Sequence, residues 1–404
     1  MAPSRSKFTR IRPTDETHSV TTLELLFDLV FVFAFTQVTA LMAHDPTPTG
    51  ALRGLVLLAL LWWSWCSYAW LGNQADAEEG IVRATVILAL SAMFIVALTI
   101  PESFHDLPGG LFAPFVFAAC YAFVRVAHLA CYYIAAGEDS GLRRQLIVTA
   151  IPVAGAAALL VLGGALGPPY QTGLWALALL VDYSGIWLTG TSGWRLPSPG
   201  HFAERHGLIF IVALGESLVA IGVGVTDEPV SMAVIIASLL GIVVSVSLWW
   251  LYFDVVAPVA EGVLSSTQGD ERSVLARDSY TYLHFPIVIS IIYIALGLKK
   301  TLSYVSDTAH HDLSDALTGT PLVALYAGVA VHLLGHVAFR RRNVGTWNPH
   351  RTIAAVLLLV LLPVAWHLPA LASLALVALV LAALVAYEVR QFGEAREQVR
   401  HPAA

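Results

Sequence analysis

Charged residues are scarce in this sequence. Of its 404 residues, 12% are charged and 57% are hydrophobic, and the mean hydropathy is +0.73. Soluble domains carry about 25% charged residues. Because the charged fraction is half of that and apolar runs recur along the whole length, the composition excludes an ordinary soluble domain and predicts a polytopic membrane protein.

Cysteine is also scarce, and nucleotide-binding motifs are missing from the sequence. The three cysteines lie in apolar runs without the spacing of metal ligands, so we expect no disulfide framework. The first twenty or so residues are polar and basic and lack the apolar core of a cleaved signal peptide, so we expect the first apolar helix to be retained. No glycine-rich phosphate signature follows a strand, and we expect no cofactor.

Twelve apolar segments have the length of a membrane-spanning helix. The sequence therefore predicts an all-α polytopic membrane protein with about 12 transmembrane helices. The expected spans are 24–43, 51–72, 83–101, 112–136, 145–166, 172–190, 207–226, 230–256, 281–300, 319–339, 352–367 and 369–388. Only a tight turn around Pro369 separates the last two, so eleven spans is the alternative.

The basic residues predict the orientation of these spans, because cytoplasmic loops are enriched in lysine and arginine. With the N-terminus in the cytoplasm, all but four of the 22 basic residues fall in cytoplasmic segments. Arg53, Lys299 and Lys300 fall on the opposite side, and Arg125 lies within a span. We therefore expect both termini in the cytoplasm. Arginine far outnumbers lysine, and alanine and leucine abound, which suggests a GC-rich bacterial genome and hence a location in the bacterial inner membrane.

The two halves of the chain share features that point to an internal duplication. The fourth segment reads YAFVRVAHLACYY and the tenth reads YAGVAVHLLGHVAF, and the second and eighth each carry a tryptophan pair. The offsets of about 187 to 204 residues predict two six-helix halves, residues 1–200 and 201–404. Six spans in each half would relate the halves as a parallel repeat.

Carboxylates inside the spans are the first candidates for function. A charge at the centre of a span costs about 2.5–3.5 kcal/mol, so such a group faces protein or water rather than lipid. Glu24 and Asp28 lie four residues apart, on one face of the first span. Glu216 and Asp182 lie near the middle of the seventh and sixth spans. The alternatives are an interaction of Glu24 with the helix N-terminus and a protonated, hydrogen-bonded Glu216.

Cationic and imidazole groups lie in other spans. Arg125 remains protonated in any protein site and therefore needs a carboxylate partner. Asp28, Asp182 and Glu216 are its candidates, and for Asp28 we expect a cation on another helix. His128, three residues after Arg125, lies on the same helix face and belongs to the same predicted polar site.

One histidine pair permits a metal site. His332 and His336 lie four residues apart and share a face of the tenth span. Two histidines alone are a weak indication of a metal, so the pattern favours histidines that are hydrogen-bonded to other protein groups.

Two stretches of the sequence carry a resemblance to a known family. LELLFDLVFVFAFTQV and ERHGLIFIVALGESLVAIG resemble the motifs E-L-F-F-D-L-V-F-V-F and E-R-x-G-L-F-x-I-I-x-L-G-E-S of the bacterial low temperature requirement protein A family. The likeness extends from about residue 15 to 390 and implies a multi-pass bacterial membrane protein with a role in growth in the cold, but no defined biochemical activity. By this resemblance the signature positions are Glu24, Phe27, Asp28, Glu204, Arg205, His206, Gly215, Glu216 and Ser217.

The favoured function is a transporter or permease that moves a small solute or ion. Buried carboxylates in duplicated halves fit proton or cation coupling, with Asp28 and Glu216 carrying the proton or ion. Arg125 would hold a carboxylate or bind an anionic substrate. A cation channel is the alternative, since Phe27-Asp28 is similar to the start of the first helix in one potassium-channel family, but no carbonyl filter motif is present.

An intramembrane enzyme acting on lipid is a further alternative. Its candidates would be His128, His332 and His336 with Glu204 or Asp254, but no HExxH spacing is present, so we favour a protein that is not an enzyme. We expect membrane lipid and a small solute or ion as partners and no nucleic acid. The sequence predicts neither the substrate nor the oligomeric state.

Overall fold

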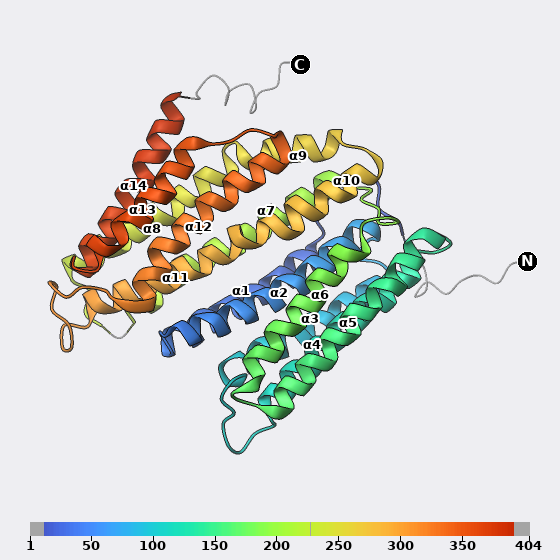
Figure 1. Cartoon of the computed structure of the whole chain (residues 1–404), viewed down its shortest axis with the longest axis horizontal. Helices are drawn as coiled ribbons and strands as arrows, with labels where there is room; N and C mark the ends of the chain where they lie inside the picture. The colour runs from blue at the N-terminus through green and yellow to red at the C-terminus, as the bar shows by residue number, and fades with distance from the viewer. Residues whose placement is uncertain (1–11, 227, 392–404) are drawn as a thin grey trace, which may run out of the picture. The chain divides into compact units, whose positions relative to one another are not determined.

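A computed structural model of the chain describes residues 12–226 and 228–391. These residues form helices joined by loops, and the described ranges contain isolated β-bridges but no strand (Figure 1). The helices are α1 (Thr22–His44), α2 (Pro48–Gln74), α3 (Gly80–Thr99), α4 (Ala113–Ala135), α5 (Ser140–Leu166), α6 (Tyr170–Thr189), α7 (Pro199–Val223), α8 (Met232–Phe253), α9 (Val256–Ser266), α10 (Gly269–Leu275), α11 (His284–Ser306), α12 (Gly319–Val344), α13 (Pro349–Ala365) and α14 (Ala370–Gln391). A short 3₁₀ turn (Ile100–Glu102) follows α3, and a π-helical segment (Ala276–Leu283) joins α10 to α11.

The helices confirm the all-α polytopic fold, and each of the twelve predicted segments corresponds to one of them. By length and apolar composition, 11 helices of the described chain can cross a membrane. The twelfth, α13, has 17 residues. At about 1.5 Å per residue it is roughly 26 Å long, slightly less than the hydrocarbon core of about 30 Å. The choice between eleven and twelve spans therefore depends on α13.

The orientation of the spans stays a prediction. Five of the basic residues that support it lie outside the described residues, as do both chain termini. These basic residues are Arg5, Lys7, Arg10, Arg396 and Arg400.

Short polar side chains mark the starts of several helices. The Asp139 carboxylate accepts a hydrogen bond from a first-turn N–H of α5, and the Ser231 hydroxyl does so for α8. Asn348 caps α13 in the same way, and Pro349 follows it at a position where a missing N–H costs nothing. At the other end of a helix, Gly345 stops α12 with a φ of 74°, which glycine adopts without steric cost.

The chain divides into two compact units. The first contains the described residues of 1–38, 52–205 and 267–277, and the second those of 39–51, 206–266 and 278–404. The parallel relation between halves 1–200 and 201–404 stays a prediction. Each unit has a core of its own.

Tryptophan packing fixes the positions of α4, α5 and α6 in the first unit. The Trp175 ring of α6 is fully buried and stacks on Phe117 of α4, with ring centroids 4.8 Å apart. Its indole N–H donates to the Leu160 carbonyl of α5 at 3.0 Å. Gly163 of α5 allows this approach, because a Cβ at that position would lie 2.7 Å from the Trp175 ring. The contacts hold α4 and α6 in one core, and these helices carry Arg125 and Asp182.

Glycines also bring α11 and α12 together in the second unit. A Cβ on Gly297, Gly328 or Gly335 would lie within 3 Å of a side chain on the opposite helix. Small residues of this kind let membrane helices pack closely. At one end of the same unit, the guanidinium of Arg351 on α13 donates two hydrogen bonds of 2.8 Å to the Glu388 carboxylate on α14.

Replacing Gly163 with alanine tests the packing around Trp175. The added methyl group would overlap a tryptophan that is enclosed on its other sides, so we expect a loss of about 1–3 kcal/mol in unfolding free energy. Gly173→Ala on α6 is the matched control, since a Cβ there meets no atom within 4 Å. Thermal unfolding in detergent should show a lower midpoint for Gly163→Ala only. Equal midpoints would contradict the described packing of α5 against α6.

Candidate functional site

In the first unit, α1 and the first residues of α7, up to Arg205, present complementary pairs of side chains to each other. Helix α1 carries Glu24 and Asp28 one turn apart, and α7 carries His201 and Arg205 one turn apart. Arg205 Nη1 lies 2.7 Å from Glu24 Oε1, and its Nη2 lies 2.8 Å from Asp28 Oδ1. A single guanidinium therefore bridges both carboxylates, and the cation that the sequence requires for Asp28 is Arg205.

The bridge is almost completely removed from solvent. Arg205 is 1% exposed, and Glu24 and Asp28 are 2% exposed each. Removing such charges from water costs several kcal/mol per ion, which is recovered only when the geometry is good and the remaining polar atoms are hydrogen-bonded. Arginine suits this position because its planar group has five N–H donors and stays charged. The residues around the bridge should therefore satisfy its other atoms.

Glu24 is held from several sides. Its Oε2 accepts hydrogen bonds from the Thr21 N–H at 2.9 Å and the Thr21 hydroxyl at 3.0 Å. The Thr21 hydroxyl in turn accepts from the Glu24 N–H at 3.3 Å, which completes a capping box at the start of α1. Gly72 of α2 provides room, because a Cβ there would overlap Glu24 Oε1. Glu24 thus interacts with the start of its helix, as one of the two sequence interpretations expected, and it also takes part in the ion pair. A transport role for Glu24 stays a prediction.

The hydrogen bonds of Asn73 define the protonation of His201. Asn73 Oδ1 accepts from the Ser198 N–H, and its Nδ2 donates to the Ser198 carbonyl, which fixes the orientation of the amide. The same Nδ2 lies 3.3 Å from His201 Nδ1, so this ring nitrogen is an acceptor. The proton of the neutral imidazole is then on Nε2, which lies 3.1 and 3.2 Å from the two oxygens of Glu24 and donates to them.

Asp28 is less completely satisfied than Glu24. Its Oδ1 accepts hydrogen bonds from Arg205 and, at 2.8 Å, from the indole N–H of Trp65. Its Oδ2 is buried and has no hydrogen-bond partner among the described residues. With a neutral His201, two carboxylates share one guanidinium and the cluster has a surplus negative charge. Asp28 Oδ2 is the atom at which a proton or cation would compensate for it.

A second buried ion pair in the same unit is balanced in charge. Arg125 Nη2 lies 3.0 and 3.2 Å from the two oxygens of Asp182, so Asp182 is its partner among the three carboxylates considered. The guanidinium also donates to the Ser67 hydroxyl. His128 is buried beside Tyr68, with ring centroids 5.5 Å apart, and belongs to the surroundings of this pair.

The remaining carboxylate candidate lies in the second unit. Glu216 is 1% exposed on α7, and the hydroxyl of the next residue, Ser217, lies 2.8 Å from the Ser245 hydroxyl of α8. Packing does not require glycine at position 215, since a Cβ on Gly215 would meet no atom within 4 Å. His206 contacts the His284 ring at a centroid distance of 5.2 Å. A transport role for Glu216 stays a prediction.

The histidine pair on α12 is hydrogen-bonded to protein groups. His332 Nδ1 lies 3.1 Å from the Ile287 carbonyl, and His336 Nδ1 lies 2.7 Å from Arg351 Nη1. Neither belongs to a group of three potential ligands within the described ranges, where such a group occurs only at His18, Glu24 and His201. These contacts agree with the interpretation of His332 and His336 as hydrogen-bonded polar histidines.

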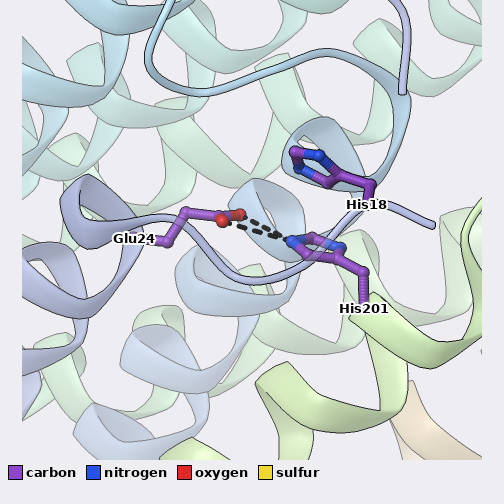
Figure 2. A group of neighbouring side chains, drawn as sticks. All are labelled: His18, Glu24 and His201. Carbon is purple, nitrogen blue, oxygen red and sulfur yellow. Dashed lines mark hydrogen bonds and ion pairs between the residues drawn. The ribbon is translucent and has the colours of Figure 1, made fainter. Parts of the chain in front are cut away.

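The group at His18 is a possible metal centre. Three potential ligand atoms, one from each of His18, Glu24 and His201, all lie within 4.8 Å of one another. Figure 2 shows both rings beside the carboxylate. Burial lowers the pKa of His18 below its ordinary value. The His18 ring is therefore neutral at pH 7, which is the form that binds metals.

Two other signature residues support the start of α1. Phe27 is buried and packs on the Tyr68 ring at a centroid distance of 5.1 Å. Glu204 Oε2 accepts a hydrogen bond from the Val20 N–H at 3.4 Å, just before the helix. The contacts of Trp65 and His201 with the two carboxylates were not predicted from the sequence. The four-residue spacing of His201 and Arg205 matches that of the two carboxylates and could have indicated the pairing.

These helices and buried charges define a multi-pass integral membrane protein. The profile of the family described as "Bacterial low temperature requirement A protein (LtrA)" matches residues 19–386, so the chain belongs to this family. It is also similar to "Uncharacterized protein RA0937" of Rhizobium meliloti (strain 1021), with 28% identity over 335 residues and 80% of each chain covered. No solved structure is a significant match.

The two buried ion pairs should respond differently to loss of a carboxylate. Asp182→Asn leaves the Arg125 charge without a carboxylate, which costs about 3–5 kcal/mol in unfolding free energy. Asp28→Asn leaves Arg205 paired with Glu24 and removes the surplus charge, so we expect a change below about 1 kcal/mol. Thermal or denaturant unfolding of the purified variants in detergent measures the difference.

The double variant Arg125→Leu, Asp182→Leu serves as the control for charge balance. Replacing both partners of a buried pair with apolar groups is often close to neutral, so it should recover most of the stability lost in Asp182→Asn. If Asp28→Asn proves as unstable as Asp182→Asn, the Glu24–Arg205–Asp28 cluster has no surplus charge.

Proposed function

We propose that the protein is a transporter that couples the movement of a small solute to a proton or another cation. The observation that carries the proposal is the sharing of Arg205 by Glu24 and Asp28, with one oxygen of Asp28 left without a hydrogen-bond partner in the described part of the chain. Ionisable groups within membrane spans commonly mark ion and proton paths. In this cluster Asp28 binds the coupling ion, and Glu24 does not take part in the coupling.

Protonation of Asp28 changes the forces on Arg205. With Asp28 charged, the guanidinium is attracted to both carboxylates on α1. With Asp28 neutral, it retains the charged hydrogen bond only to Glu24, and the contact with Asp28 weakens because charge-assisted hydrogen bonds are about twice as strong as neutral ones. Binding of the ion thus alters the contact between α1 and the first turns of α7. A change of this kind can link ion binding to helix movement.

The Arg125–Asp182 pair supports the assignment of Asp28 as the ion-binding group, because it lacks the surplus charge of the Arg205 cluster. Its charges balance one to one and both oxygens of Asp182 accept from Arg125, so no further ion is needed there. This pair stabilises the packing of α4 and α6. It should not change its protonation during transport.

Flux measurements in proteoliposomes test the proposal. Internal pH and current would be recorded under proton, potassium and sodium gradients, with and without a mixture of amino acids, sugars and organic acids. We expect the wild type to take up ions only when a suitable solute is added. In Asp28→Asn the rate of ion uptake should fall at least tenfold, because an amide cannot exchange the ion.

Glu78→Gln is the matched control for this measurement. Glu78 is an exposed carboxylate that also accepts a hydrogen bond at the start of α1, from the Thr22 N–H at 3.1 Å. This variant should retain the wild-type flux. Flux that needs no solute would indicate a channel instead, and wild-type flux in folded Asp28→Asn would contradict the role of Asp28.

A further inference from the structure

We propose that His18, Glu24 and His201 form a binding site for a divalent transition metal of the Zn²⁺ class. The three residues provide two imidazoles and one carboxylate, a ligand set that zinc uses in sites with an open fourth position. The site would bind metal whether or not the protein transports a solute, so it does not rest on the proposed function.

The distances between the ligand atoms fit a metal ion. Two atoms bound at about 2.0–2.2 Å to a tetrahedral zinc are separated by roughly 3.3–3.5 Å. His201 Nε2 already lies 3.1 and 3.2 Å from the Glu24 oxygens, and the third ligand atom, from His18, lies within 4.8 Å. Small side-chain shifts would therefore complete the geometry. The His18 and His201 rings lie 4.8 Å apart at an angle of 47°, beside the same carboxylate (Figure 2).

The atoms of His18 are available for this role. Its Nε2 is buried and has no hydrogen-bond partner within the described part of the chain. The Ser198 hydroxyl donates to its backbone carbonyl at 3.2 Å, so the segment before α1 is held next to the start of α7. An imidazole nitrogen that is shielded from water and has no partner gains more from a ligand than a solvated one.

The outer contacts of the carboxylate also resemble those of a metal ligand. Ligating carboxylates are themselves hydrogen-bonded, and Glu24 receives such bonds from Thr21 and Arg205. Arg205 keeps its second carboxylate, Asp28, when Glu24 turns toward a metal. The surplus negative charge of the cluster attracts a cation to this position and offsets the repulsion by Arg205.

The orientation of the Asn73 side chain affects the affinity of the proposed site for metal. A metal on His201 Nε2 replaces the proton there, and the proton on the neutral ring then moves to Nδ1. The Asn73 amide presents its NH₂ group to Nδ1 and has to turn away from the Ser198 carbonyl to accept from it. This rearrangement weakens binding in the wild type. An aspartate at position 73 would accept from Nδ1–H directly, as in carboxylate–histidine–metal arrangements.

Titration of the full-length, tag-free protein in detergent with Co²⁺ tests the site. After treatment with chelator, we expect one Co²⁺ per chain, with the visible absorption of a low-coordinate N/O site and displacement by Zn²⁺. His18→Ala should lower the affinity at least tenfold, because it removes a ligand without touching the Glu24–Arg205 bridge. Asn73→Asp should raise it about 10–100-fold.

Two further variants make the outcome decisive. His105→Ala removes an exposed histidine from a loop of the same unit and should leave the affinity unchanged. Asp28→Asn keeps all three ligands, so it should still bind Co²⁺ saturably, with a lower affinity because the surplus charge is removed, even where ion flux is lost. Failure of the metal site and failure of the proposed transport are therefore distinguishable. An absence of saturable Co²⁺ binding, or equal affinities for His18→Ala and His105→Ala, would overturn the proposal.

Discussion

The first unit depends on one buried guanidinium. Arg205 cannot lose its charge, so it must have carboxylates within reach, and α1 provides two of them one turn apart. The neighbouring groups follow from this constraint. Thr21 holds Glu24, Trp65 holds Asp28, and Gly72 leaves space for the carboxylate. The hydrogen bonds from Thr21 and Trp65 satisfy carboxylate oxygens that would otherwise be buried at a cost of about 1–3 kcal/mol.

The two groups of buried ions in the first unit differ in their balance of charge, and we infer their different roles from this difference. Arg125 and Asp182 neutralise each other, whereas Glu24, Asp28 and Arg205 leave one negative charge. A protein that needed only stability would gain by neutralising that charge, because buried ion pairs are at best weakly stabilising. The surplus therefore has a physical use if the site takes up a cation. The same surplus favours a proton at Asp28 and a metal at Glu24, and these two sites share Arg205 as the group between them.

The sequence predicted the helices well because long apolar runs and their interruptions are local signals. It also showed that Asp28 and Arg125 need partners of opposite charge, since isolated charges in a membrane span are unstable. The choice of partner was not predictable, because it depends on helix rotation and packing. His201 was not predicted because it lies before the apolar run expected as the seventh span, residues 207–226, whereas α7 begins at Pro199 and brings His201 onto its first turn.

The central claim is that Asp28 is the carboxyl group that gains and loses a proton. Infrared difference spectroscopy between about pH 8 and pH 5.5 measures this directly, because a protonated carboxylic acid has a C=O stretching band that a carboxylate lacks. Exposed carboxyl groups, with ordinary pKa values of about 3.9–4.3, stay largely ionised over that range. We predict such a band in the wild type, its loss in Asp28→Asn and its persistence in Glu78→Gln. A band that persists in Asp28→Asn, or a wild type without one, would contradict the claim.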